Sequence, residues 1–92
     1  GSNGVGVSDV NQLYILTENS TEVPNTPDKG NTGWSENNPT WNNDKVQYLW
    51  ICTETIYTDG NKAYSAPYTD ANWKTATEAV KSMEQSFGTL RD

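Results

Sequence analysis

The 92-residue chain has no histidine and contains only one cysteine, one phenylalanine and one methionine. A single cysteine, Cys52, excludes an internal disulfide and a thiolate metal cluster. Without histidine, Cys52 also lacks the imidazole base that usually activates a cysteine nucleophile. Because Cys52 lies within an apolar run, we expect it to be a small buried side chain.

Positive charge and long hydrophobic runs are also scarce. Six basic residues against twelve acidic ones give a net charge of −6. Nucleic acids and anionic membrane surfaces are bound through basic patches, so we expect neither as a partner. No apolar run approaches the ~18 residues of a membrane-spanning helix. Only 33% of the residues are hydrophobic, so the aromatic residues must supply much of the core.

The strongest secondary-structure signal is a strand over residues 46–58, which is dense in β-branched and aromatic side chains. The dipeptide Asp59-Gly60 follows it and is typical of a hairpin turn. Residues 62–68 are predicted to return as its partner, with Pro67 at the end, and residues 10–17 to form another strand. We therefore predict a mainly β fold: a small antiparallel sheet of three to four strands with a central hairpin, followed by a C-terminal amphipathic helix.

The helix is predicted over residues 71–87, with Thr69 or Asp70 as its N-terminal cap and Gly88 at its C-terminal cap. Two packings remain open. The helix packs on its own sheet, or it begins a dimeric or trimeric coiled coil, which would make the chain an oligomer through this segment. The isolated fragment favours the first, because a helix of ~17 residues is marginal alone in water. The apolar residues follow a 3-4-3-4 spacing and are Trp73, Ala76, Val80, Met83 and Phe87.

The predicted organisation has three parts. Residues 1–6 form a flexible lead-in, residues 7–68 a β module, and residues 69–92 the C-terminal helix and tail. Within the β module, residues 18–33 read as a long loop rich in Asn, Thr, Pro, Asp and Gly.

Three stretches carry a family resemblance: Gly4-Val5-Gly6-Val7-Ser8, then Trp34-Ser35-Glu36-Asn37-Asn38-Pro39-Thr40-Trp41, then the strand from Tyr48-Leu49-Trp50 to Tyr57-Thr58-Asp59-Gly60. Together they resemble a small module, often repeated, of tail and tail-fibre (minor structural) proteins of phages and prophages of Gram-positive bacteria. The resemblance covers roughly residues 4–68. It departs from the family pattern at Cys52, where Thr or Ser is expected, and at Thr53, where a basic residue is common.

The resemblance implies a non-enzymatic structural or adhesion module of a prophage-encoded virion tail. Its partners would be other tail-protein segments or subunits, and trimers are the usual symmetry of tail fibres. The sequence itself shows no catalytic constellation, so we expect no enzyme, no cofactor and no metal. Asp28-Lys29-Gly30-Asn31 resembles part of a calcium loop but lacks its alternating acids and terminal Glu.

The alternative function is a carbohydrate-binding module of a bacterial surface or secreted protein, which would be extracellular or at the cell surface. Trp and Tyr rings stack on the apolar faces of sugars, and here they lie among Asn residues that can bond sugar hydroxyls. The opposing interpretation is that a chain with so few aliphatic residues needs its rings for the core, as we expect for Tyr48 and Trp50. The candidate glycan-stacking residues are Trp34, Trp41, Tyr57 and Tyr64.

Overall fold

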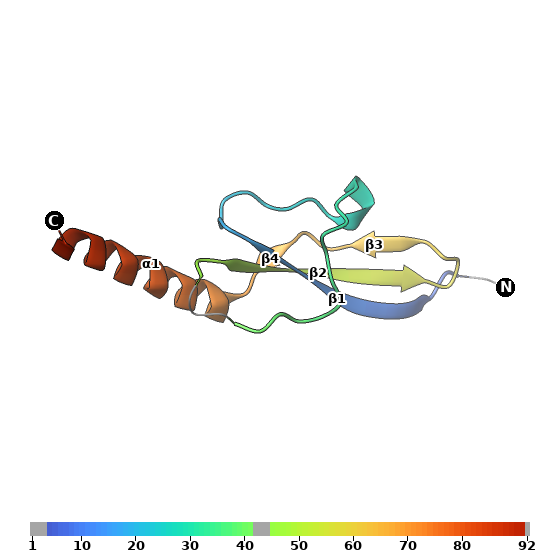
Figure 1. Cartoon of the computed structure of the whole chain (residues 1–92). Helices are drawn as coiled ribbons and strands as arrows, with labels where there is room; N and C mark the ends of the chain where they lie inside the picture. The colour runs from blue at the N-terminus through green and yellow to red at the C-terminus, as the bar shows by residue number, and fades with distance from the viewer. Residues whose placement is uncertain (1–3, 42–44, 92) are drawn as a thin grey trace.

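The structure, a computed structural model, describes residues 4–41 and 45–91, with side chains as far as Met83. Residues 1–3 of the expected lead-in, and the side chains of Phe87 and Leu90, lie outside the described part. An antiparallel four-stranded sheet precedes a single long helix, which confirms the predicted fold class (Figure 1). The elements are β1 (Val7–Thr17), the short 3-10 helix η1 (Pro27–Lys29), β2 (Tyr48–Tyr57), β3 (Lys62–Tyr64), β4 (Tyr68–Thr69) and α1 (Ala71–Arg91).

Strand β2 lies at the centre of the sheet, and it begins two residues later and ends one residue earlier than the predicted strand over residues 46–58. β1 pairs with the whole length of β2, from Val7 opposite Tyr57 to Thr17 opposite Tyr48. β1 begins three residues earlier than expected. On the other side, β2 and β3 form the predicted hairpin. Gly60 lies at its turn with φ of 89°, a left-handed conformation that glycine adopts without strain.

The return strand predicted over residues 62–68 is instead divided into β3 and β4, which both pair with β2. At the break, Ser65 keeps contact with Thr53: its backbone N–H donates to the Thr53 carbonyl at 3.0 Å, and its hydroxyl accepts from the Thr53 N–H at 2.9 Å. Pro67 has no N–H to donate to the ladder, so continuous pairing cannot pass through it. The single-strand prediction was therefore wrong at this point.

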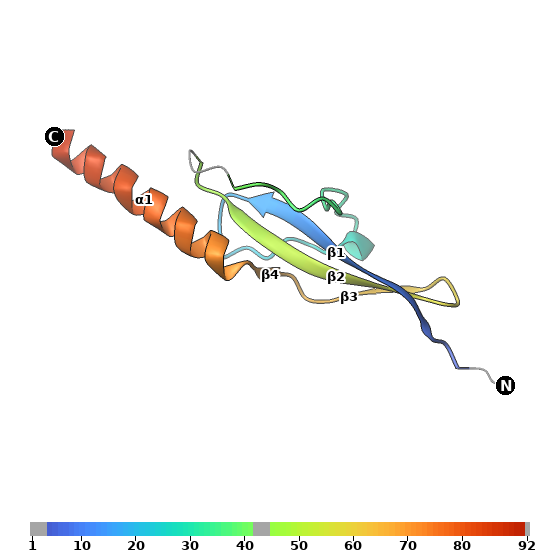
Figure 2. The ribbon, with the colours of Figure 1, turned by 90° about the horizontal axis from the view of Figure 1, so that it is seen from below.

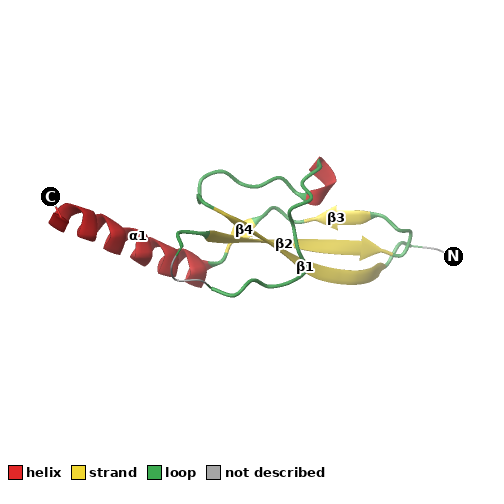
Figure 3. Cartoon of the chain, viewed as in Figure 1, coloured by secondary structure: helices red, strands yellow, loops and turns green. Residues whose placement is uncertain are grey.

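The sheet has two faces that are covered differently. On the helix face, Tyr14 and Leu16 of β1 and Leu49 and Ile51 of β2 pack with Trp41 and Trp73. On the opposite side, the loop face, the neighbouring residues Leu13, Tyr48, Trp50, Cys52 and Glu54 are all buried. The first part of the long connection between β1 and β2, which includes η1 and extends to Glu36, covers the loop face (Figure 3). The end of the connection carries Trp41 on the helix face. The burial of Tyr48, Trp50 and Cys52 agrees with the sequence prediction.

Helix α1 begins at the predicted cap. The Asp70 Oδ1 accepts a hydrogen bond from the Trp73 backbone N–H at 2.8 Å, so Asp70 rather than Thr69 is the capping side chain. The helix continues through Gly88 to Arg91, so the predicted end at residue 87 was wrong. A glycine inside a helix costs only about 1 kcal/mol relative to alanine, which does not force the helix to end.

Among the side chains that the structure describes, those of the first turns of the helix contact the sheet. Trp73 and Thr77 are buried, and the Thr77 hydroxyl donates to the Gln47 carbonyl, whereas Val80 is half-buried and Met83 is 59% exposed. Beyond this point α1 runs away from the sheet along the long axis of the molecule (Figures 1 and 2). The result is an elongated body of 72 × 20 × 16 Å. The start of the helix packs on its own sheet, as in the first of the two predicted packings, and the remainder projects.

Candidate ligand-binding site on the loop face

A buried carboxylate lies at the centre of the loop face. Glu54 of β2 stands directly opposite Asn11 of β1 and Tyr64 of β3, so the three side chains form one row across the sheet. Glu54 is only 9% exposed. Its Oε1 accepts from the Asn11 Nδ2 at 3.2 Å, and its Oε2 accepts from the Tyr64 hydroxyl at 2.9 Å. Each carboxylate oxygen therefore has one uncharged donor that holds it in place.

The electrostatics of Tyr64 reflect this row. Burial raises the pKa of the Tyr64 phenol, and the hydrogen bond to Glu54 raises that pKa further because the phenol is the donor to a carboxylate. Tyr64 is thus kept protonated, and a protonated phenol is the form that can hold Glu54. At neutral pH the Tyr64 phenol therefore has the proton that it donates to Glu54.

An open hollow of about 370 Å³ lies over this carboxylate. Leu13 and Glu54 of the sheet lie at its base, and Lys62 of β3 stands at one side. The remaining lining comes from the covering loop: Pro27, Asn31, Thr32, Trp34 and Glu36. The hollow therefore joins an indole ring, a buried carboxylate and an exposed ammonium group.

Hydrogen bonds inside the loop fix the position of Trp34. The Asn25 carbonyl accepts from both the Trp34 Nε1 at 2.7 Å and the Asn31 Nδ2 at 3.0 Å. The Asn31 Oδ1 in turn accepts from the Gly33 N–H at 2.9 Å. With both of its amide ends engaged inside the loop, Asn31 acts mainly as a brace for the wall that carries Trp34.

The loop is also attached to the sheet at its end. Tyr14 and Ser35 exchange two backbone hydrogen bonds, of 2.7 and 2.9 Å, in an isolated antiparallel bridge. Next to it, Gly33 lies so close to β1 that a Cβ there would stand 3.1 Å from the Ile15 Cδ1. The chain on both sides of Trp34 is therefore held against β1 or within the loop.

The structure divides the four candidate glycan-stacking residues. Trp34 is half-buried and lines the hollow above Glu54, whereas Tyr64 holds Glu54 through its hydroxyl and lines a neighbouring hollow beside the loop. Trp41 instead packs edge-on against Trp73, with ring centroids 5.2 Å apart, on the helix face. Tyr57 ends β2 on the helix-face side of the alternation. The four rings do not form one surface.

Sequence reasoning missed the contributions of Asn11 and Lys62. The predicted site residues also did not include Glu54, although it is the one carboxylate within residues 46–58. The pairing of Tyr64 with Glu54 was not available from the Asp59-Gly60 signal, because a two-residue turn at these positions would place Tyr64 opposite Thr55, one residue away from the observed register. The partner on β1 was not available either, since nothing in the sequence aligns β1 with β2. The Asn42, Asn43 and Asp44 side chains, expected near Trp41, lie outside the described residues.

The described residues offer no group of three or more His, Cys, Asp or Glu side chains placed to hold a metal ion. Over the same residues, no helix has the length and apolar character needed to cross a membrane.

No protein-family model, curated protein or solved structure matches the chain. Three features bear on the function of the chain: the sequence resemblance, the elongated shape and the hollow above Glu54.

Proposed function

We propose that the chain is a non-enzymatic structural module of a phage or prophage tail protein, located in the virion tail and joined to other tail segments or subunits. The observation that carries this proposal is the shape of the molecule. It is 72 Å long and no more than 20 Å across, and the start of β1 and the end of α1 lie at opposite ends of the long axis (Figure 1). A module entered at one end and left at the other adds its full length to a fibre.

The sheet and the helix produce this shape together. The long β1–β2 ladder extends from the hairpin end to the helix end, and α1 then continues in the same direction (Figure 2). The docked first turns of α1 connect the two parts, because Trp73 packs on Leu49 and Ile51 and the Thr77 hydroxyl bonds the Gln47 carbonyl. These contacts make the junction a packed one, which suits a spacer that must keep its direction.

Immunogold electron microscopy tests this proposal. An antibody raised against the 92-residue chain should label the tails of phage particles produced by the source strain, and antibody preadsorbed with the chain should not. Label confined to the cell surface, with unlabelled particles, would contradict the tail assignment and favour the extracellular alternative.

A second candidate function, carbohydrate binding, is supported by a separate observation. The Trp34 ring and the Glu54 carboxylate line one hollow, a combination suited to stacking on a sugar and bonding its hydroxyls. This role is compatible with a tail module, which would then serve adhesion. A glycan array and a titration with cell-wall polysaccharide test it: saturable binding supports the role, and no binding across cell-wall glycans contradicts it.

A further inference from the structure

We infer that the hollow above Glu54 is a subsite for one neutral sugar residue, in which Glu54 accepts hydrogen bonds from sugar hydroxyls while the Trp34 ring stacks on the sugar. This inference rests on the carbohydrate-binding role proposed above. It assigns sugar binding to one site, the hollow above Glu54, in place of the four separate candidate rings. In this subsite the Glu54 carboxylate would give specificity for hydroxyl groups, and the Trp34 ring would supply the apolar contact.

Glu54 keeps unused acceptor capacity. An ionised carboxylate has about four acceptor sites, and Asn11 and Tyr64 occupy one on each oxygen. Burying a carboxylate is costly unless it is well bonded. The remaining acceptor capacity lies on a group that lines the hollow, so a guest that donates hydroxyl groups would complete the bonding of Glu54. Hydrogen bonds to an ionised acceptor are roughly twice as strong as those between neutral groups.

The charges around the hollow favour a neutral guest. Lys62 lines the same space, so an ammonium or guanidinium guest would face a like charge there. An anionic guest would face Glu54 and Glu36 instead. A neutral sugar avoids both repulsions, because its hydroxyls can donate to the two carboxylates and accept from the Lys62 ammonium.

The size and rigidity of the hollow fit one ring. At about 370 Å³ it lies at the lower end of the ~300–1,000 Å³ range of ligand pockets. Because the Trp34 N–H already donates to Asn25, the indole can offer a guest only its carbon surface. Both the ring and the carboxylate are held in place without a ligand, which lowers the ordering cost of binding.

The test is a titration of the ¹⁵N-labelled 92-residue chain, followed by NMR, with methyl glycosides of neutral hexoses and N-acetylhexosamines. Glucosamine and glucuronate serve as the cationic and anionic comparators. We expect saturable shifts centred on Asn11, Trp34, Glu54 and Lys62 with at least one neutral sugar, and weaker binding of both charged sugars.

Three variants assign the site. Glu54→Gln keeps the shape but removes the charge, and should weaken binding by about tenfold or more, since a hydrogen bond to a charged group contributes ~1.5–3 kcal/mol. Trp34→Leu should abolish detectable binding by removing the stacking ring. Glu78→Gln is the matched control on the exposed surface of α1, and should bind as the wild type does. An unchanged amide spectrum outside the hollow shows that each variant is folded.

The outcomes separate this inference from the broader role. Sugar binding that survives in both Glu54→Gln and Trp34→Leu, with shifts around Trp41 or Tyr57, overturns the site but keeps carbohydrate binding. Preference for glucosamine or glucuronate over every neutral sugar overturns the assignment of a neutral guest. Absence of binding to these sugars and also to cell-wall polysaccharide overturns both the inference and the carbohydrate-binding role.

Discussion

The two faces of the sheet are built from alternate residues of the same strand, β2, yet they are covered by different means. On the helix face, Leu49 and Ile51 are covered by Trp41 and Trp73, whose rings meet edge to face at 85°. This cover is apolar and short: it ends where α1 leaves the sheet, and Val10 on the hairpin half of this face is 55% exposed. The helix face is thus closed by packing at one end only.

The loop face is covered along more of its length, and its cover is the largely polar first part of the connection between β1 and β2. The covering loop is held by hydrogen bonds, such as those at the Asn25 carbonyl, and its apolar residues Pro27 and Trp34 are only half-buried. Beneath it, Trp50 is 4% exposed and its Nε1 donates to the Thr17 Oγ1 at 2.8 Å. Because a polar loop does not pack closely on the strand beneath it, an open space lined by polar groups remains between them. This explains why the hollow lies on this face.

The largest expected effect comes from removing a ring of the helix face. Trp73→Ala should destabilise the chain by about 3–5 kcal/mol, the usual cost of deleting a buried aromatic side chain. We expect the lower end of this range, because the buried Trp73 Nε1 has no acceptor among the described residues and its removal relieves that cost. Urea unfolding followed by circular dichroism measures the loss.

Trp34→Ala is the matched comparison on the loop face. Because Trp34 is half-buried, its loss should destabilise the chain by clearly less than the loss of Trp73. A larger loss for Trp34 than for Trp73 would reverse the comparison, since it would make the loop the main source of stability.

A second prediction concerns the loss of stability at alkaline pH, which is expected to arise from two groups on the loop face. Burial raises the pKa of the Cys52 thiol above its ordinary 9.0, and raises that of the Tyr64 phenol above its ordinary 10.0. A group with a raised pKa in the folded state binds its proton more tightly there, so its contribution to stability is complete below the unfolded pKa and is lost as the pH rises through the folded one. The free energy of unfolding should therefore fall from about pH 9 upward.

Urea midpoints measured between neutral and alkaline pH check this expectation. The double variant Cys52→Ala, Tyr64→Phe removes both titrating groups and should show a smaller alkaline loss than the wild type. If the two proteins lose stability equally, another part of the chain controls the alkaline response and the loop face does not.

Much of the sheet could be predicted from the sequence because local signals decide it. The alternation along β2, the Asp59-Gly60 turn and the Asp70 cap each act over a few residues, and each was found where expected. The split at Pro67 and the helix that continues through Gly88 were not predicted, because each depends on a balance between a local penalty and pairing or helix propagation around it. Thr77 was missed because only apolar residues were assigned to the buried stripe.

The candidate site was harder to predict because its parts come from segments far apart in the chain. Asn11, Glu54 and Tyr64 meet only once β1, β2 and β3 are aligned, and Trp34 reaches them through a loop without periodicity. The separation of Trp34 from Trp41, seven residues away, depends on which face of the sheet each covers. Composition identified the rings as important, but the path of the loop decides their surroundings.

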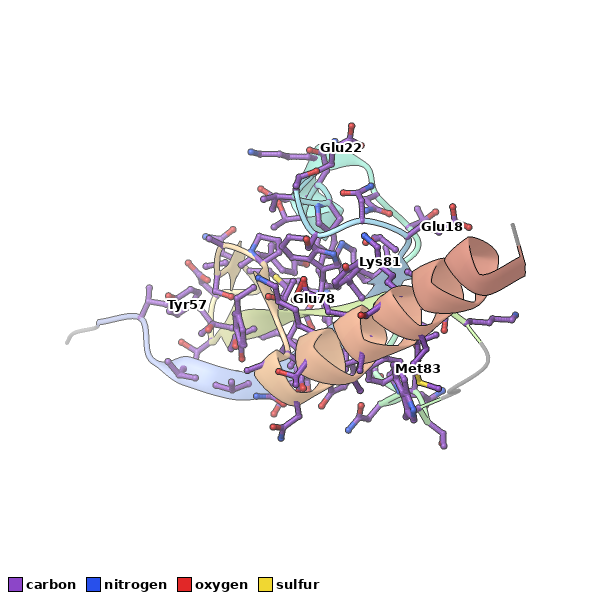
Figure 4. The ribbon with its side chains drawn as sticks, turned by 90° about the vertical axis from the view of Figure 1, so that its left-hand side faces the viewer. Glu18, Glu22, Tyr57, Glu78, Lys81 and Met83 are labelled. Atoms are coloured by element: carbon purple, nitrogen blue, oxygen red, sulfur yellow. The ribbon has the colours of Figure 1, made fainter. Side chains whose placement is uncertain are left out.

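The smallest expected effect concerns the projecting part of α1, and it tests how far the cover of the helix face extends. Lys81 and Met83 project from opposite sides of the helix, and Met83 is exposed (Figure 4). From Val80 to Leu90 the apolar stripe covers about one and a half heptads, well short of the ~3–4 that a sustained coiled coil needs. We therefore expect the isolated chain to sediment as a monomer at all concentrations.

Val80→Asp is the decisive variant, because Val80 is half-buried where α1 leaves the sheet. If the docked turns around Trp73 and Thr77 supply the helix–sheet contact, the variant should remain folded, lose little stability and keep the sedimentation coefficient of the wild type. A larger wild-type species that dissociates in Val80→Asp would contradict this and show that self-association covers the stripe. The helix face would then be completed by a second copy of the chain, and its short intramolecular cover would be only the first part of an interface that continues along α1.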